Sequence, residues 1–176
     1  MARASGVLSQ FVNFLTMNYD ILITSGTILD GSGENPRVGD IGIKSDRIAA
    51  MGDLGGSTAT QRINALGKFV APGFIDITNH SDTHLTLFRY PGFESLVTQG
   101  VTSIIGGNCG ASLAPLASRT ALGAIKKWAD PSQINVNWST TEEFLHEVER
   151  MRLAVNFGMF AGYGTVRRGV VNDEIR

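Results

Sequence analysis

The stretch "KFVAPGFIDITNHSD", residues 68–82, marks a change in the architecture of the chain. It starts as a near-continuous apolar run with a break at Pro72-Gly73, and it turns polar after Asp76. Apolar runs of this kind are typical of strands buried on both faces, as in a parallel sheet covered by helices. We therefore expect an α/β architecture from residue 69 onward.

The residues before this stretch predict short strands and no helix. The segment "YDILITSGTILDGSG" (residues 19–33) predicts two strands separated by a turn at Ser25-Gly26. The alternating segment "GDIGIKSDRIAAMG" (residues 39–52) predicts two more strands joined by a turn. A small β-sheet domain or layer is therefore the prediction for residues 17–68.

Beyond residue 73, apolar strands alternate with helical segments. Two further apolar runs, "VTSIIGG" (residues 101–107) and "LAVNFGMFAG" (residues 153–162), predict buried strands. Helices are expected between and beside these strands, at residues 93–100, 118–130 and 140–151. This alternation predicts three strand–helix units of a parallel α/β fold, fewer than the eight that a closed (β/α)8 barrel requires.

Polar residues mark where two helices begin. Ser139 or Thr140 lies three residues before Glu142 or Glu143, which predicts a capping box. Near the end of the chain, "VVNDEIR" predicts the first turn of another helix with Asn172 as its N-cap. We therefore expect the chain to stop within its fold.

The composition excludes several classes of protein. The formal net charge is −1, so there is no basic excess for binding nucleic acid or an anionic membrane surface. No apolar run approaches the roughly 18 residues that span a bilayer. The single cysteine, Cys109, excludes an intrachain disulfide framework and fits a reducing, cytoplasmic compartment. Residues 1–16, which precede a second methionine at Met17, are expected to form a disordered extension.

Polar residues follow two of the predicted strands. If the chain stayed extended after residue 76, one face of the strand would carry Asp76, Thr78, His80 and Asp82. Cys109 follows the next strand, in "IIGGNCGAS". The carboxyl ends of parallel strands face the ligand site, and imidazole, carboxylate and thiolate suit zinc. The residues alone leave two alternatives open, a polar strand end that bonds its own loop and a buried, inert cysteine.

A third segment, "GYGTVRRG" (residues 162–169), is expected to form a loop after the third strand. Arg167 or Arg168 there could bind a substrate carboxylate through two hydrogen bonds. The alternative is a solvated loop arginine. The other two histidines are weaker candidates, because His84 would be an accessory polar group and His146 would lie on a helix surface.

Together these segments resemble the amidohydrolase superfamily, in particular its N-acyl-D-amino-acid deacylase (D-aminoacylase) branch. The resemblance covers residues 17–176. "DILITSGTILDGSG" resembles the opening strands of that family, and "VAPGFIDITNHSD" resembles its first barrel strand with the His-x-His motif. "QGVTSIIGGNCGASLAP" resembles the segment that leads into Gly-Asn-Cys-Gly. "AVNFGMFAGYGTVR" resembles the third strand and the Gly-His-Gly-Thr-Leu-Arg loop.

The resemblance implies the N-terminal fragment of a zinc-dependent hydrolase. The implied fold is part of a small β-sandwich (residues 17–68) followed by the first three or so β/α units of an incomplete (β/α)8 TIM-type barrel (residues 69–176). The implied reaction is hydrolysis of the carbon–nitrogen amide bond of small N-acyl-D-amino acids by a zinc-activated water. The family's catalytic aspartate lies on a later strand, so no catalytic residue is expected in this chain, and the chain alone is expected to be inactive.

Individual site residues carry over by position. Cys109 matches a zinc-binding cysteine, and His80 matches the second histidine of His-x-His. Three residues are expected to contact the substrate: Arg167, Asp82 and Tyr163. Two positions depart from the family, because Thr78 replaces the first histidine of His-x-His and Tyr163 replaces the histidine of Gly-His-Gly. A hydroxyl is a poor zinc ligand beside an imidazole, so we expect a single zinc ion.

Two other functions remain open at this point. One is a cyclic-amide hydrolase of the hydantoinase or dihydroorotase kind, although those relatives usually keep both histidines and lack Asn-Cys-Gly. The other is a non-catalytic protein that keeps the amidohydrolase fold, since Thr78 removes one usual metal ligand. A metal assay distinguishes the second alternative from an enzyme with one zinc ion.

Overall fold

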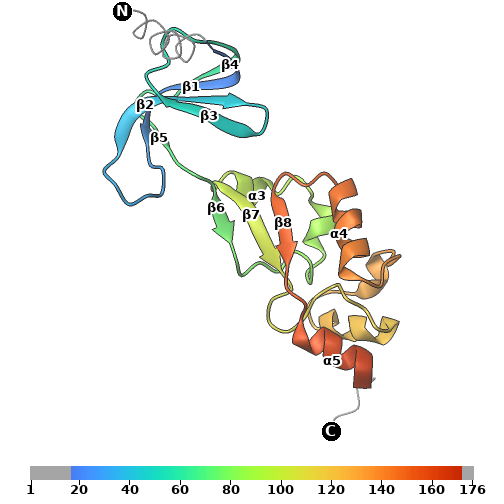
Figure 1. The fold of residues 1–176 in the computed structure, drawn as a ribbon. Coiled ribbons are helices and arrows are strands. Elements are labelled where there is room, and N and C mark those ends of the chain that lie inside the picture. Colours follow the sequence, from blue (N-terminus) through green and yellow to red (C-terminus); the bar gives the residue numbers. More distant parts are fainter. Residues whose placement is uncertain (1–16, 172–176) are drawn as a thin grey trace, which may run out of the picture. The chain divides into compact units, whose positions relative to one another are not determined.

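The computed structural model describes residues 17–171, in two compact units that divide between Pro72 and Gly73 (Figure 1). The predictions for residues 1–16 and for a helix beginning at Asn172 lie outside the described residues. The described part of the first unit holds strands, and that of the second holds strands and helices. In the second unit helices lie between successive strands along the chain, which confirms an α/β fold.

Five strands form one sheet in the first unit. In chain order they are β1 (Asn18–Ile28), β2 (Arg37–Lys44), β3 (Arg47–Gly52), β4 (Thr58–Asn64) and β5 (Phe69–Val70). Their order across the sheet is β3-β2-β1-β4, and β5 also pairs with β1. β2 runs antiparallel to β1 and β3, whereas β4 and β5 run parallel to β1.

The predicted turn at Ser25-Gly26 is wrong, because these residues belong to the single long strand β1. The register of β1 against β2 shifts between Ile23 and Gly26, which marks a β-bulge. Ser25 has a left-handed φ of 59°, and its N–H donates to Asp40 Oδ1 at 2.9 Å. A bulge adds a residue without ending the strand, so the local pattern resembles a turn although pairing continues.

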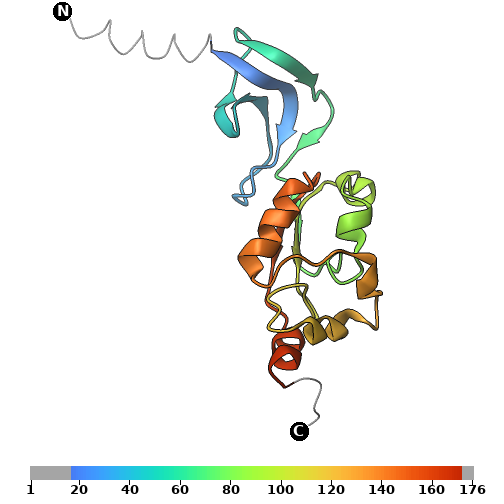
Figure 2. The ribbon, with the colours of Figure 1, turned by 90° about the vertical axis from the view of Figure 1, so that its right-hand side faces the viewer.

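Three parallel strands and the surrounding helices form the second unit. The strands lie in the order β6 (Phe74–Asp76), β7 (Val101–Gly106) and β8 (Asn156–Met159). The helices are α2 (Thr86–Arg89), α3 (Glu94–Val97), α4 (Thr141–Arg150) and α5 (Tyr163–Val171), with 3-10 helices η1 (Arg119–Ile125) and η2 (Pro131–Gln133). α5 lies beyond the carboxyl end of β8 in both views (Figures 1 and 2). Within residues 17–171, no helix is long and apolar enough to cross a membrane.

The core of the second unit joins β7, α4 and the segment between them. Ile104, Leu113 and Phe144 are fully buried in this core. The Trp138 ring packs on Phe144 with centroids 5.0 Å apart, and its indole N–H donates to the Leu113 carbonyl at 2.7 Å. This core supports the loops that follow β6 and β7, since all of these elements belong to one unit.

The capping box predicted for α4 is confirmed, with Thr140 and Glu143 as its members. The Thr140 hydroxyl accepts a hydrogen bond from Glu143 N–H at 3.1 Å. The Glu143 carboxylate accepts in return from Thr140 N–H at 3.0 Å and from Ser139 N–H at 2.7 Å. Amide groups that would otherwise lack partners at the helix start are thus satisfied.

The structure corrects two predictions of local structure, one of a helix and one of a loop. The predicted α-helix at residues 118–130 is a 3-10 helix, η1, followed by turns. The predicted loop at residues 162–169 is instead most of helix α5, which packs against η1. A Cβ added to Gly123 in η1 would lie 2.8 Å from the Arg168 guanidinium of α5. The two elements whose form differs from the prediction therefore pack closely on each other, and tertiary contacts of this kind can override local propensity.

Candidate metal and substrate site

The loop after β6 turns away, so the predicted extended row of Asp76, Thr78, His80 and Asp82 on one face is wrong. β6 ends at Asp76, and bends and turns follow. The Asp76 carboxylate accepts from Thr78 N–H at 3.1 Å and from the Asn79 side-chain amide at 2.8 Å. A side chain that bonds the backbone two residues further on competes with continued strand geometry.

The loop after β7 holds Cys109 in an unusual backbone conformation. Cys109 has φ of 53°, between Gly107 at 75° and Gly110 at 77°. A left-handed φ is unfavourable for residues other than glycine, so the surrounding contacts hold Cys109 in place. A Cβ at Gly107 would overlap the Phe160 backbone, which explains the need for glycine there. The Cys109 side chain remains exposed.

The two loops bring His80 and Cys109 together. Cys109 Sγ lies 3.6 Å from His80 Nε2. A tetrahedral zinc ion with bonds of about 2.3 Å to sulfur and about 2.05 Å to nitrogen places those two donors about 3.6 Å apart. The chemistry and the spacing of this pair therefore fit zinc. No cluster of three or more such donors occurs within residues 17–171, so the pair supplies only part of a coordination shell.

Aromatic side chains surround the His80 ring. Trp128 stacks on it with centroids 6.1 Å apart and 29° between the planes. The His84 ring meets it edge-on at 6.2 Å. His80 Nδ1 is buried and has no hydrogen-bond partner in the described part of the chain. With Nδ1 enclosed and Nε2 beside Cys109, Nε2 is the ring nitrogen placed to act as a candidate metal ligand.

Asp82 is fully buried, so the structure places it in the interior of the second unit. Its Oδ2 accepts a hydrogen bond from Gly107 N–H at 2.9 Å, whereas Oδ1 has no partner among the described residues. Burial raises the pKa of the Asp82 carboxyl, and hydrogen bonds from the Thr83 and Gly107 backbone oppose this effect. The predicted contact of Asp82 with the substrate has no support from this position.

An open pocket of about 490 Å³ lies beside Cys109. Tyr163, at the start of α5, lines this pocket and is 76% exposed. Three basic side chains and no acidic side chain also line it: Lys126, Lys127 and Arg168. The predicted Arg167 is exposed but does not line the pocket, whereas its neighbour Arg168 does. The pocket thus offers positive charge next to the candidate metal ligands.

No family model matches the chain, but comparison with known proteins finds relatives that agree with one another in their described activity. A D-aminoacylase from Alcaligenes xylosoxydans xylosoxydans is 36% identical over 155 residues, which cover 88% of this chain and 31% of the relative. An N-acyl-D-glutamate deacylase from the same organism is 36% identical over 161 residues, or 88% of this chain and 30% of the relative.

Solved structures give the same result. An N-acyl-D-glutamate deacylase from Bordetella bronchiseptica, complexed with zinc and a phosphonate inhibitor, has a TM-score of 0.75 and 31% identity, covering 89% of this chain and 32% of that one. The chain is homologous to the N-acyl-D-amino-acid deacylases of the amidohydrolase superfamily. It spans about a third of the length of these deacylases. The family resemblance inferred from the motifs is confirmed.

A second structural relative bears on the number of metal ions in the deacylases. It is a D-aminoacylase with a binuclear metal center, described by one-metal activation and second-metal attenuation. Its TM-score is 0.71 at 34% identity, and the match covers 88% of this chain and 32% of that one. In this homologue of the deacylases, the described residues bring the candidate metal ligands His80 and Cys109 to within 3.6 Å of each other.

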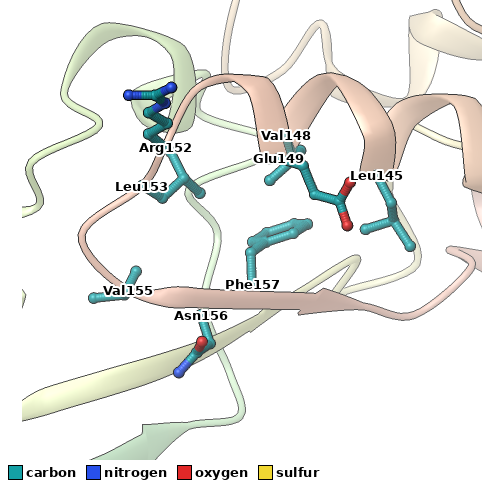
Figure 3. Close-up of a pocket in the computed structure, with 8 residues that line it drawn as sticks. All are labelled: Leu145, Val148, Glu149, Arg152, Leu153, Val155, Asn156 and Phe157. Carbon is teal, nitrogen blue, oxygen red and sulfur yellow. The ribbon is translucent and has the colours of Figure 1, made fainter. Parts of the chain in front are cut away.

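A separate pocket lies between α4 and the start of β8 (Figure 3). Val148 and Glu149 come from the helix, and Phe157 of β8 lies between the helix and the strand. This pocket is at the amino end of β8, whereas His80 and Cys109 follow the carboxyl ends of β6 and β7. Ligands of parallel α/β folds bind at carboxyl ends, so we assign the deacylase-like site to the other pocket.

Sequence reasoning did not find two residues of this site. Trp128 stacks on His80, and Lys126 lines the pocket beside Cys109. Both come from the long segment between β7 and α4. This segment folds back to the carboxyl ends of the strands, and no local sequence pattern indicates that path. The basic pair Lys126-Lys127 beside an aromatic residue was the available signal, and it was interpreted only as part of a helix.

Proposed function

We propose that this chain is the N-terminal part of a zinc-dependent hydrolase that deacylates N-acyl-D-amino acids. The observation that carries the proposal is the 3.6 Å contact between Cys109 Sγ and His80 Nε2, formed by loops at the carboxyl ends of two parallel strands. The substrates would be small molecules rather than nucleic acid or membranes, and the protein would act in the cytoplasm. Homology to D-aminoacylases supports this assignment.

The residues of this chain would hold zinc and position the substrate. His80 Nε2 and Cys109 Sγ are the proposed zinc ligands, and other parts of the protein would complete the shell. When bound, zinc supplies Lewis-acid chemistry that activates water and polarises an amide carbonyl. The residue that transfers protons is proposed to lie outside this chain, so we expect the 176-residue chain alone to be inactive.

The proposed whole-protein fold explains the two units of the chain. The five-stranded sheet of the first unit would be part of a β-sandwich, and β6, β7 and β8 would be the first strands of a (β/α)8 barrel. Parallel pairing of these three strands supports the barrel, because barrel strands all run in one direction. In such a barrel, His80, Cys109 and Tyr163 would follow the first, second and third strands.

The pocket beside Cys109 is the proposed place for the substrate carboxylate. The Arg168 guanidinium is suited to carboxylate binding through two hydrogen bonds, and Lys126 adds positive charge. Tyr163 would contact the rest of the substrate from the start of α5. Arg167 remains a second candidate from the sequence, although it lies outside the residues that line the pocket.

A cyclic-amide hydrolase is the second candidate function. A D-hydantoinase from Rhizobium radiobacter is 36% identical, but over only 88 residues, or half of this chain. The D-aminoacylase match covers 88% of the chain at the same identity, so it favours deacylation of open-chain amides.

Metal content and substrate choice test the proposal together. The protein that carries this chain is purified as the wild type and as Cys109→Ala, zinc is quantified, and N-acetyl-D-amino acids, their L-isomers and hydantoins are assayed. We expect about one zinc per chain in the wild type, loss of zinc in the variant, and hydrolysis restricted to the D-isomers. Absence of zinc from both proteins would instead favour a non-catalytic protein, and hydantoin hydrolysis would favour the second candidate.

A further inference from the structure

We propose that Asp82 is a positioning residue that sets the distance between the metal-binding atoms of His80 and Cys109. Its Oδ2 accepts a hydrogen bond from Gly107 N–H at 2.9 Å. Asp82 lies two residues after His80, and Gly107 lies two residues before Cys109. This bond therefore connects the two loops close to both donor atoms. The inference rests on the proposed metal site.

The Asp82 carboxyl group packs directly on the end of β7. A Cβ added to Gly106 would lie 2.9 Å from Asp82 Cγ, so only glycine leaves room for the carboxyl group. The Asp82 side chain is fully buried, which limits its movement. The contact is thus suited to holding the two loops at a fixed separation.

A buried carboxyl group at position 82 lowers the stability of the fold more than an apolar side chain of similar size would. Asp82 Oδ1 is buried and has no hydrogen-bond partner among the described residues. A buried acceptor without a partner lowers the stability of the fold. The groups around a metal-binding histidine hold its ring in the orientation that binds metal, and removing such a group lowers the metal affinity. A role in positioning the metal ligands explains why a hydrogen-bond acceptor occupies this buried place.

Two nearby contacts help to separate this role from general loop stability. The Asn108 side-chain amide donates to the Asn79 carbonyl at 3.1 Å, which also joins the two loops. Asp76 is the matched control, because its carboxylate bonds only Thr78 and Asn79 within its own loop. Removing Asp76 therefore perturbs the loop that carries His80 without cutting its link to the loop that carries Cys109.

The experiment measures Co²⁺ binding to the whole 176-residue chain through the thiolate-to-cobalt charge-transfer absorption. The variants are Asp82→Ala, Asp82→Asn and Asp76→Ala, with Cys109→Ala to show that the absorption comes from the thiolate. We expect Asp82→Ala to weaken Co²⁺ binding about 10- to 100-fold. Asp82→Asn should retain wild-type affinity, because its amide oxygen still accepts from Gly107, and Asp76→Ala should have little effect.

Amide hydrogen exchange tests the link between the two loops independently of metal binding. The Gly107 amide should lose protection in Asp82→Ala and keep it in Asp82→Asn, with circular dichroism confirming the fold. If Asp82→Ala does not fold, Asp82→Ser, whose hydroxyl is too short to replace the carboxylate, takes its place. Absence of the absorption in the wild type would refute the metal site alone. Unchanged protection in Asp82→Ala, or equal loss of affinity in Asp76→Ala, would overturn the role of Asp82.

Discussion

At the scale of single residues, the pocket beside Cys109 distinguishes two adjacent arginines. Arg168 lines this pocket, and Arg167 does not. We expect Arg168→Ala to raise KM for an N-acyl-D-amino acid about 10- to 100-fold, because a hydrogen bond to a charged group contributes about 1.5–3 kcal/mol. Arg167→Ala is the matched control and should change KM little. Steady-state kinetics of the protein that carries this chain check the prediction, and a larger effect of Arg167→Ala would reverse the assignment.

The sequence singled out the two candidate metal ligands, His80 and Cys109, which the structure brings together, but it did not predict their surroundings. Cys109 and His80 could be found because each follows an apolar strand, and parallel strands bring such positions to one edge. The contacts of Trp128 with His80 and of Asp82 with Gly107 depend on how loops fold back. Those paths are decided by tertiary packing, which leaves no periodic pattern in the sequence.

At the scale of elements, the capping box of α4 contributes measurably to the free energy of unfolding. Thr140→Ala should lower the free energy of unfolding by about 1 kcal/mol, since it removes the side chain that caps the helix. Hydrogen bonds from the Thr140 and Ser139 backbone lower the pKa of Glu143 below its usual 4.5. Its contribution is therefore complete above pH 4.5 and is lost as the pH falls through the lowered value.

Urea denaturation at several pH values checks the prediction for α4. The stability difference between the wild type and Glu143→Gln should shrink as the pH falls below 4.5. Glu142→Gln is the control, because Glu142 lies in the same first turn but is not part of the capping box. An equal pH dependence for both variants would mean that general charge near the helix start, and not the cap, is responsible.

Elements with local signals were predicted well, and elements shaped by neighbours were not. α4 has an apolar face and a capping box, and both are visible in the sequence. Residues 162–169 were predicted as a loop because they follow the third strand, yet they form most of helix α5, which packs on η1. Gly123 and Gly169 mark close approaches between these elements rather than turns. Glycine content alone could not distinguish the two uses.

At the scale of the whole molecule, β6 leaves an apolar edge uncovered. Within residues 17–171, β6 pairs only with β7. Phe74, Ile75 and Ile77 are 66%, 63% and 65% exposed, which is unusual for large apolar side chains so close together. An exposed apolar edge is a template for pairing with another chain. We therefore expect the 176-residue chain to associate with itself through this edge.

Sedimentation at several concentrations tests this association with two variants of equal charge. Ile77→Lys should weaken self-association about 10- to 100-fold, because an Ile side chain contributes about 1.5–3 kcal/mol when it is buried. Ile77 lies beyond the last paired residue of β6, so the substitution spares the sheet. Val170→Lys on α5 is the control, since Val170 is 71% exposed on another element. Equal weakening by both variants would indicate that added charge, and not the β6 edge, controls association. A selective effect of Ile77→Lys would locate the contact at the edge where the proposed barrel requires a further strand.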